Sequence, residues 1–408
     1  MKARQMLFAL LLGVAAPAVA QSALPPEPAV HEAIDAHPSV LAAQARVEAA
    51  RAEARSLRTG GNEFNFQASH MRRDVQGLGT VPEYDAQLSH PIRLPGKAKL
   101  DRAAGEFGIT AAENEAEDAR HQAASLLNDL WWDWLGASAE ARVDAQSVAN
   151  YEATLAAITR RVELRDMAPL EADQTQAALG EARTVATQSK GRADLALARL
   201  KARFPGLPLP VDPPEPPQPQ MPLESFEAMA AQVIERSHEI GAASAQSGRF
   251  AALADRARKD RFADPSFGVR LFSEQGGRER GAGLLISMPI GGANRRALAD
   301  MAASQGQAAA AELAAVRLDV QEMASRDVTR AHSAMQTWQQ AREALNAQMA
   351  ALSKTRRGHQ LGAIDLADVL QSERLTHAAF RAEALARAEA NRAINCLMID
   401  SHNLWIND

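Results

Sequence analysis

The histidines and the single cysteine are the side chains of this 408-residue chain that could bind a metal ion or act as nucleophiles. The ten histidines are scattered, without the i, i+4 spacing or the cysteine partners that make a metal site. Cys396 stands alone, which excludes an intrachain disulfide and a cysteine-based zinc cluster. No Ser–His–Asp order, glycine-rich phosphate loop or paired-carboxylate motif occurs in a recognisable context. We therefore predict no catalytic residue, no metal site, no cofactor and no enzymatic activity.

Two aspartates, Asp173 and Asp368, occupy matching positions in the two halves of the chain. Each follows a break in a helical pattern, at residues 166–169 and 361–364, and a pair of arginines precedes each break. On spacing alone, either carboxylate is a solvated charge in the first turn of a helix, where the helix dipole favours it.

A segment that occurs twice indicates which elements position these aspartates. Residues 87–97 and 284–295 are alternating runs that end in proline and glycine, and a long alanine-rich, charged stretch follows each. Proline and glycine mark a change of structure, and the hydrophobic period changes there from 2 to about 3.6. Each copy predicts a strand that leads into a long helix. The repetition indicates two copies of one unit.

These periodicities divide the chain into a signal peptide, two helix–strand–strand–helix repeats and a proline-rich linker. The expected segments are 1–20 for the signal peptide, 21–204 and 223–408 for the repeats, and 205–222 for the linker. The expected strands are residues 62–73, 82–93, 265–274 and 281–290. The expected long helices are residues 97–165, 168–204, 294–360 and 364–398, and shorter helices over 31–57 and 225–261 precede the strands.

The first twenty residues have the pattern of a secretory signal peptide. Lys2 and Arg4 form a basic region, residues 6–15 form an apolar region, and small residues around Ala20 supply the cleavage site. A short anchor helix is the alternative, but the apolar run is too short to cross about 30 Å of hydrocarbon. No later segment reaches about 18 apolar residues without a charge, so we expect no transmembrane helix.

Composition favours long, thin helices over a compact globular core. The formal net charge is −5, and lysine and arginine form no basic stripe, so we expect no nucleic acid partner. Aromatic residues make up only 4% of the chain, while alanine alternates with charged and amide residues. Such helices, some 70 residues long, would reach roughly 100 Å.

The four expected strands are long enough to cross a bilayer as barrel strands. Strands in a bilayer leave no free edge, and about eight strands make the smallest filled barrel, so four strands cannot close. Three chains would supply twelve strands, and their long helices would continue the barrel as a helical tunnel. A soluble four-stranded sheet that caps a helical bundle is the alternative. The acidic and amide-rich face of each strand pair favours the barrel.

Over essentially all of its mature length the chain resembles the TolC-type outer-membrane efflux channels. The twofold helix–strand–strand–helix repeat, the two proline–glycine joints and the segment 361–370 carry the resemblance. The joint formed by residues 94–97 is most similar to the heavy-metal branch, the CzcC channels of cation efflux systems. The resemblance implies a fold that is mainly α with a small membrane β-barrel: a trimer with a twelve-stranded barrel in the outer membrane of a Gram-negative bacterium and a long periplasmic α-helical tunnel.

The resemblance also implies partners and sites. It implies contact with outer-membrane lipid, docking to a periplasmic adaptor (membrane fusion) protein, and an inner-membrane pump of the resistance-nodulation-division class. Asp368 matches the first aspartate of the family's constriction ring, Asp173 is its counterpart, and Gln371 stands where the family has a second aspartate. Such a ring attracts cations and gates by repulsion or ion pairing. Adaptor docking would fall on the tips, at Asp166, Met167, Ala168, Pro169, Leu361, Gly362, Ala363 and Ile364.

We therefore expect a passive exit duct of a tripartite efflux system, with heavy-metal cations as a candidate cargo. A duct of the same fold for type I protein secretion is the first alternative. A periplasmic coiled-coil scaffold or adaptor without a pore is the second. The family usually has glycine where this chain has Met167, which leaves the geometry of the first turn open.

Overall fold

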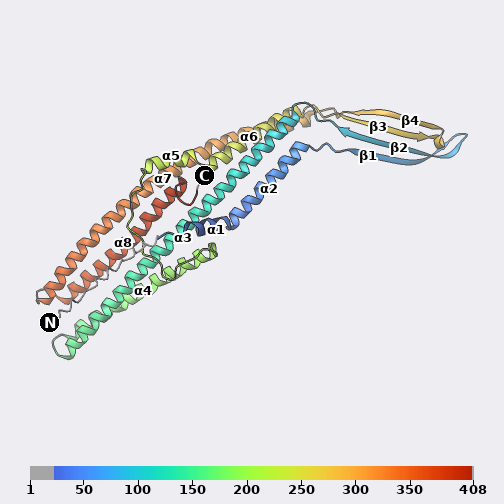
Figure 1. The fold of residues 1–408 in the computed structure, drawn as a ribbon. Coiled ribbons are helices and arrows are strands. Elements are labelled where there is room, and N and C mark those ends of the chain that lie inside the picture. Colours follow the sequence, from blue (N-terminus) through green and yellow to red (C-terminus); the bar gives the residue numbers. More distant parts are fainter. Residues whose placement is uncertain (1–22, 407–408) are drawn as a thin grey trace, which may run out of the picture.

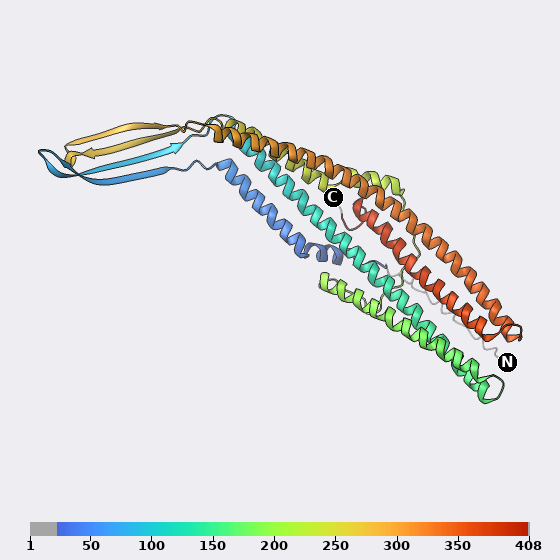
Figure 2. The same ribbon diagram turned by 180° about the vertical axis from the view of Figure 1, so that it is seen from behind.

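The computed structural model describes residues 23–406 as an elongated molecule, with strands at one end and two helix hairpins at the other (Figures 1 and 2). The chain is mainly helical and carries a small antiparallel sheet, as the sequence predicts. The expected signal peptide lies outside the described residues. Among the helices described, none combines the length and the apolar content that crossing a membrane requires.

The same order of elements, two short helices, two strands and two longer helices, occurs twice along the chain. The first half comprises α1 (Glu27–Asp35), α2 (Pro38–Thr59), β1 (Asn65–Val75), β2 (Gly79–Pro91), α3 (Lys97–Glu163) and α4 (Pro169–Arg203). The second half comprises α5 (Phe226–Glu235), α6 (His238–Lys259), β3 (Ser266–Glu274), the 3₁₀ turn η1 (Gln275–Gly277), β4 (Glu279–Ser287), α7 (Ala293–Gln360) and α8 (Leu366–Asp400).

Two helices, α3 and α7, run the whole length of the body, and shorter helices pack along them (Figures 1 and 2). They contain 67 and 68 residues, which at 1.5 Å per residue corresponds to roughly 100 Å. Toward the strands, α2 packs on α3, and α6 packs on both α3 and α7; toward the tips, α4 packs on α3, and α8 packs on α7. The body is therefore a layer of antiparallel helix pairs.

The two stretches expected as single short helices are each broken in two. Residues 31–57 fall in α1 and α2, because Pro38 has no backbone N–H to continue the first helix and takes the first position of the next. Residues 225–261 fall in α5 and α6. There Ser237 is extended, and its hydroxyl accepts a hydrogen bond from the backbone N–H of Ile240 at 3.1 Å.

The hairpin ends differ by a few residues from the expected ranges. β1 and β2 continue almost to their turn, which is tight because Gly77 and Gly79 adopt positive φ angles of 86° and 70°. The polar residues near the turn still pair, down to Val75 opposite Gly79. β4 stops at Ser287, where its partner β3 begins, so residues 288–290 lie outside the sheet.

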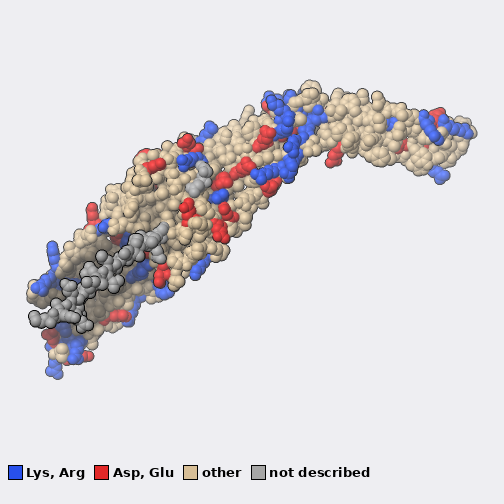
Figure 3. Space-filling view, in the orientation of Figure 1, with Lys and Arg blue, Asp and Glu red and all other residues tan. Residues whose placement is uncertain are grey.

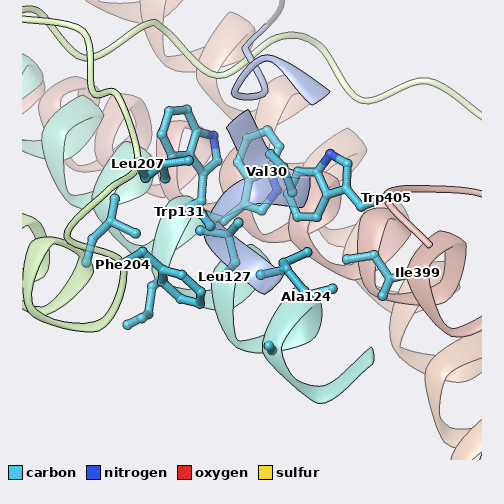
Figure 4. Packing of buried hydrophobic residues seen from close by; sticks show 14 of the residues in the cluster. Val30, Ala124, Leu127, Trp131, Phe204, Leu207, Ile399 and Trp405 are labelled. Carbon is cyan, nitrogen blue, oxygen red and sulfur yellow. The ribbon is translucent and has the colours of Figure 1, made fainter. Parts of the chain in front are cut away.

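The thickest core lies midway along the body, where segments from both halves meet (Figure 4). Trp131 of α3 is 2% exposed and packs with Val30, Phe204 and Trp405, which come from α1, the end of α4 and the C-terminal segment. Its indole nitrogen donates to the carbonyl of Ala23 at 2.9 Å, which satisfies a polar atom that would otherwise be buried unpaired. These segments thus pack around the middle of α3 and join it to α1, to the end of α4 and to α8.

The proline-rich linker lies against the body. Carbonyl groups of Pro213 and Pro217 accept hydrogen bonds from Arg142 and Asn391, at 2.7 and 2.9 Å. Because a proline has no N–H, its backbone can only accept hydrogen bonds, and side chains of the helices supply the donors for these two carbonyl groups. The linker therefore ties α4 to α5 across helices α3 and α8.

Removal of the cap of α5 is expected to destabilise the chain by about 1 kcal/mol. The Ser225 hydroxyl accepts a hydrogen bond from the N–H of Ala228 at 3.2 Å, and Ser225→Ala leaves that N–H without its partner. Ser225→Asp, which keeps an acceptor at this position, should unfold as the wild type does. Thermal unfolding followed by circular dichroism checks this, and equal midpoints for both variants would contradict it.

Candidate functional site: the sheet, its joint and the helical tips

The register of the sheet aligns four apolar residues across its middle. Phe66 of β1 lies opposite Leu88 of β2, Leu88 lies opposite Val269 of β3, and Val269 lies opposite Leu284 of β4. Directly paired residues share one face of a sheet, and residues two apart join them. The same face therefore carries Phe267, Leu271, Ile286 and Tyr84 as well.

This apolar face is uncovered in the single chain. Phe66 is 69% exposed and Leu284 is 88% exposed, and the other large residues of the face are also exposed. A contiguous apolar face of this kind marks a surface for lipid or for another protein. Charged side chains gather at the hairpin ends and where the strands meet the helices (Figure 3). The part of the strands between these two places carries few charged side chains on the face in view.

The opposite face of the sheet is mostly polar. One residue along from the apolar row, Gln67, Gln87 and Arg270 lie side by side on β1, β2 and β3. Arg270 forms an ion pair with Asp85, and Gln87 donates to Asp85 at 3.1 Å. This alternation is the pattern of a strand with lipid on one side and water on the other.

The sheet has two free edges. Its strand order is β1-β2-β3-β4, and the β2–β3 pair joins the two halves of the chain. Within the described residues β1 and β4 each pair on one side only. An exposed edge is a template for pairing with another chain. The sheet therefore leaves two edges at which strands of another chain could pair.

A buried ion cluster fixes the joint between β2 and α3. Lys97, 1% exposed, places its ammonium 2.8 Å from a carboxylate oxygen of Asp264 and 2.8 Å from one of Asp260, and it donates to the carbonyl of Phe262 at 2.8 Å. Asp264 also accepts from the N–H of Leu94 at 2.9 Å. The lysine of the first joint thus holds the segment between α6 and β3.

A second ion pair system lies beside the first. Asp101 of α3 accepts from Arg93 at 3.0 Å and from Arg256 of α6 at 2.7 Å, and Arg256 also pairs with Asp260. Burial alone would raise the pKa of Asp260, but hydrogen bonds from Arg256 and Lys97 outweigh it and lower the pKa below its usual value. The two halves of the chain therefore meet at the joint through paired charges.

The two helical tips are closed by different turns. In the first, Arg165 has a left-handed φ of 60°, and the Asp166 carboxylate accepts from Arg161 at 2.8 Å. Met167 packs on a small apolar cluster that includes Leu179 and Val369, which accounts for a large side chain in this turn. In the second, Gly362 takes the left-handed position, with φ 74°.

Asp368 lies in the first turn of α8, as expected, whereas Asp173 lies just beyond the first turn of α4, in which Glu171 is the acidic residue. Both aspartates are at the end of the body farthest from the sheet (Figure 1). Both are exposed, and within the described residues neither has a hydrogen-bond or ion-pair partner. Leu366, Val369 and Leu370 of α8 share one apolar cluster with α3 and α4, so the two tips pack together. The structure thus places the two aspartates at one end of the body, with both side chains exposed.

Three of the histidines that are scattered along the sequence lie together in the structure. His121 of α3, His238 of α6 and His402 of the C-terminal segment lie together, with ring centroids 5.9 Å apart for His121 and His402, and 4.9 Å for His238 and His402. His121 Nε2 lies 3.0 Å from the Asp400 carboxylate. The only local indication of this group in the sequence is that a carboxylate lies near two of the histidines: Asp118 three residues before His121, and Glu239 directly after His238. Neither pair has the i, i+4 histidine spacing that is typical of a metal site.

Comparison with known proteins gives a fold but no sequence match. No family model matches the chain, and no curated protein matches its sequence. Among solved structures, a membrane protein from Pseudomonas aeruginosa superimposes with a TM-score of 0.79 at 18% identity, and covers 92% of this chain and 89% of its own. The outer membrane protein VceC from Vibrio cholerae superimposes with a TM-score of 0.74 at 15% identity, over 92% and 95%.

The Neisseria gonorrhoeae MtrE outer membrane channel, in its open state, superimposes with a TM-score of 0.72 at 16% identity, over 94% of this chain and 90% of its own. These likenesses extend over nearly the whole of both chains. The chain therefore has the fold of these outer membrane channels, and its sheet and helical body correspond to theirs.

Proposed function

We propose that the chain is one subunit of a trimeric outer-membrane channel of the TolC type, and that it acts as a passive exit duct for efflux. The observation that carries the proposal is the sheet with one exposed apolar face, one polar face and two unpaired edges. A soluble sheet that capped a helical bundle would cover its apolar face, and this one projects away from the helices (Figure 2).

Closure of the barrel supports the trimer. Four strands per chain cannot form a closed barrel, and in hydrocarbon each unpaired backbone group at an edge would cost several kcal/mol. If β4 of one chain pairs with β1 of the next, three chains close twelve strands around a lumen lined by the polar face. The helical bodies then continue the lumen on the periplasmic side of the outer membrane of a Gram-negative bacterium.

The free carboxylates at the tips support a constriction there. Asp173 and Asp368, repeated by the threefold axis, would place six carboxylates around the inner end. Such a ring attracts cations and narrows the path by repulsion or ion pairing. The tips from Asp166 to Pro169 and from Leu361 to Ile364 would dock a periplasmic adaptor protein, which connects the duct to an inner-membrane pump of the resistance-nodulation-division class.

The likeness of the joint at residues 94–97 to the heavy-metal branch suggests that the duct exports heavy-metal cations. In the structure Lys97 of that joint binds Asp264 and Asp260, so it acts on the fold and not on the cargo. A transport assay in a strain that lacks its own ducts, with metal salts and organic compounds in parallel, decides the cargo. Restored secretion of a protein instead would favour the type I alternative.

Single-channel conductance of the purified protein in a planar bilayer tests the proposal. Wild type should show stable unitary events, and Asp368→Ala should raise the unitary conductance, because it removes three carboxylates from the narrowest part. Asp319→Ala, which removes an exposed carboxylate from α7 far from the tip, should conduct as wild type does. If Asp368→Ala leaves the unitary conductance unchanged, Asp368 does not form the constriction. If well-folded, inserted protein shows no conductance, the chain is not a channel, and the coiled-coil scaffold is favoured.

A further inference from the structure

A group of buried and half-buried titratable side chains that the duct does not use lies midway along the body, where α3, α6, α7 and α8 come together. It divides into two sets whose ligand atoms lie within 4.8 Å of one another in each set. His121 of the first set lies 3.0 Å from Asp400 of the second, which makes the group continuous. The members are Asp118, His121 and Glu239 in the first set, and Asp327, Cys396 and Asp400 in the second.

The first set has the donors of a metal site. It offers one imidazole nitrogen and two carboxylates, from α3 and α6, and His121 is only 8% exposed. One carboxylate oxygen of Asp118 is buried and has no hydrogen-bond partner in the described part of the chain, while the other accepts from Gln122 at 2.8 Å. A buried carboxylate oxygen without a partner is an unsatisfied acceptor, which a cation would satisfy.

We propose that Asp118, His121 and Glu239 bind a divalent first-row transition cation. Imidazole with carboxylates suits Zn²⁺, Co²⁺, Ni²⁺ and Mn²⁺, at bond lengths of about 2.0–2.2 Å. Bound ligand atoms would then lie roughly 3–4 Å apart. The ligand atoms of the three side chains already lie within 4.8 Å of one another. Water would complete the coordination, because three protein ligands leave positions open.

Neighbouring groups would orient these ligands. Asp400, 3.0 Å from His121 Nε2, is placed to hold one ring nitrogen and so present the other to the cation. The Ser237 hydroxyl donates to the Glu239 carboxylate at 2.7 Å. Carboxylate and hydroxyl partners of this kind fix the tautomer and the angle of metal ligands.

The second set is the weaker candidate. Burial, with Asp400 and Asp327 beside it, raises the pKa of the Cys396 thiol. A thiol binds a metal ion as the thiolate, and these neighbours disfavour that form. The second set therefore supports the first through Asp400 and does not bind the cation itself.

A cation at this site would link the two halves of the chain and stabilise their packing, because α3 belongs to the first half and α6 to the second. It would lie in the body and far from the tips, so it is separate from the constriction. The proposal does not depend on conduction. Conductance measured on the same preparation, with and without metal, keeps failure of the site distinct from failure of the duct.

Titration of the full-length protein with Co²⁺, after removal of metals by a chelator, tests the proposal. We expect one Co²⁺ per chain, with visible absorption bands that Zn²⁺ displaces, and a higher unfolding temperature in its presence. His121→Gln and Glu239→Gln should each weaken the affinity at least about tenfold. Glu239 is only partly buried, so this second variant keeps the test valid if His121→Gln does not fold.

His332→Gln is the matched control. His332 Nε2 also lies 3.0 Å from a carboxylate oxygen, that of Glu227, but this pair is exposed and has no third ligand among the residues that the structure describes. The control should bind Co²⁺ as the wild type does. Absence of saturable binding, or binding that neither His121→Gln nor Glu239→Gln weakens, would overturn the proposal.

Discussion

Leu284→Arg is expected to block insertion of the protein into a bilayer. Leu284 lies on the apolar face, near the middle of the length of the edge strand β4, and is 88% exposed and opposite Val269. An arginine on the lipid face of a barrel destabilises it by about 2–4 kcal/mol at the bilayer midplane, and a trimer would carry three copies. The measurement is the fraction of protein that folds into phosphatidylcholine vesicles, followed by resistance to protease and to dissociation by detergent.

Leu285→Arg provides a control that differs by one position. Leu285 pairs with Gly268, which in turn pairs with Ser89, so Leu285 lies on the opposite, polar face of the sheet. An arginine there would face water in the lumen, where substitutions change selectivity more than stability. We expect Leu285→Arg to insert nearly as the wild type does. Equal loss of insertion for both variants would mean that the sheet does not separate lipid from water.

The two faces of the sheet could be predicted from the sequence because strand alternation is a local property. Tyr84 and Leu88 on one side, and Asp85 and Gln87 on the other, already differ in polarity before any pairing is known. The hairpin ends could not be placed as well. The polar residues near a turn can pair or remain in a loop, and only the positive φ angles of the turn glycines decide between the two.

The break between α1 and α2 has a clearer signal in the local sequence than the break between α5 and α6. Pro38 alone indicates a new helix start, since proline favours the first helical position and cannot continue a helix. Ser237 is weaker evidence, because a serine within a helical pattern becomes a cap only if its backbone is extended. Whether the helix continues through Ser237 or breaks there depends on how α6 packs on α3 and α7. That packing involves residues distant in the sequence, so a local pattern does not indicate it.

The two charged clusters were beyond prediction because their members are distant in sequence. His121 and Asp400 are brought together only when α8 returns to the middle of the body. Lys97 belongs to the motif on which the sequence analysis rests, but its partners Asp260 and Asp264 lie in the other half of the chain. An acidic residue at each tip could, in contrast, be predicted from the repeat, although Asp173 lies just beyond the first turn of its helix and Asp368 lies within the first turn of its own. A role of these aspartates in gating stays a prediction.

Lys97→Met is expected to loosen the joint between sheet and body. Methionine keeps much of the volume of lysine, but it leaves the carboxylate of Asp264, 18% exposed, without its cation. Removal of one partner of a buried ion pair typically destabilises a protein by about 3–5 kcal/mol. We expect the lower end of that range, because Asp260 is 41% exposed and keeps its pair with Arg256. Thermal unfolding in detergent, followed by circular dichroism, measures the effect.

Lys99→Met is the matched control, since Lys99 lies two residues further along α3 and is exposed. It should unfold at the wild-type temperature, because within the described residues its ammonium makes no ion pair. Asp264→Asn added to Lys97→Met should recover part of the loss, as it removes the unpaired charge and keeps an acceptor for the N–H of Leu94. If Lys97→Met and Lys99→Met unfold alike, the buried cluster contributes no net stability, and the joint is held by packing alone.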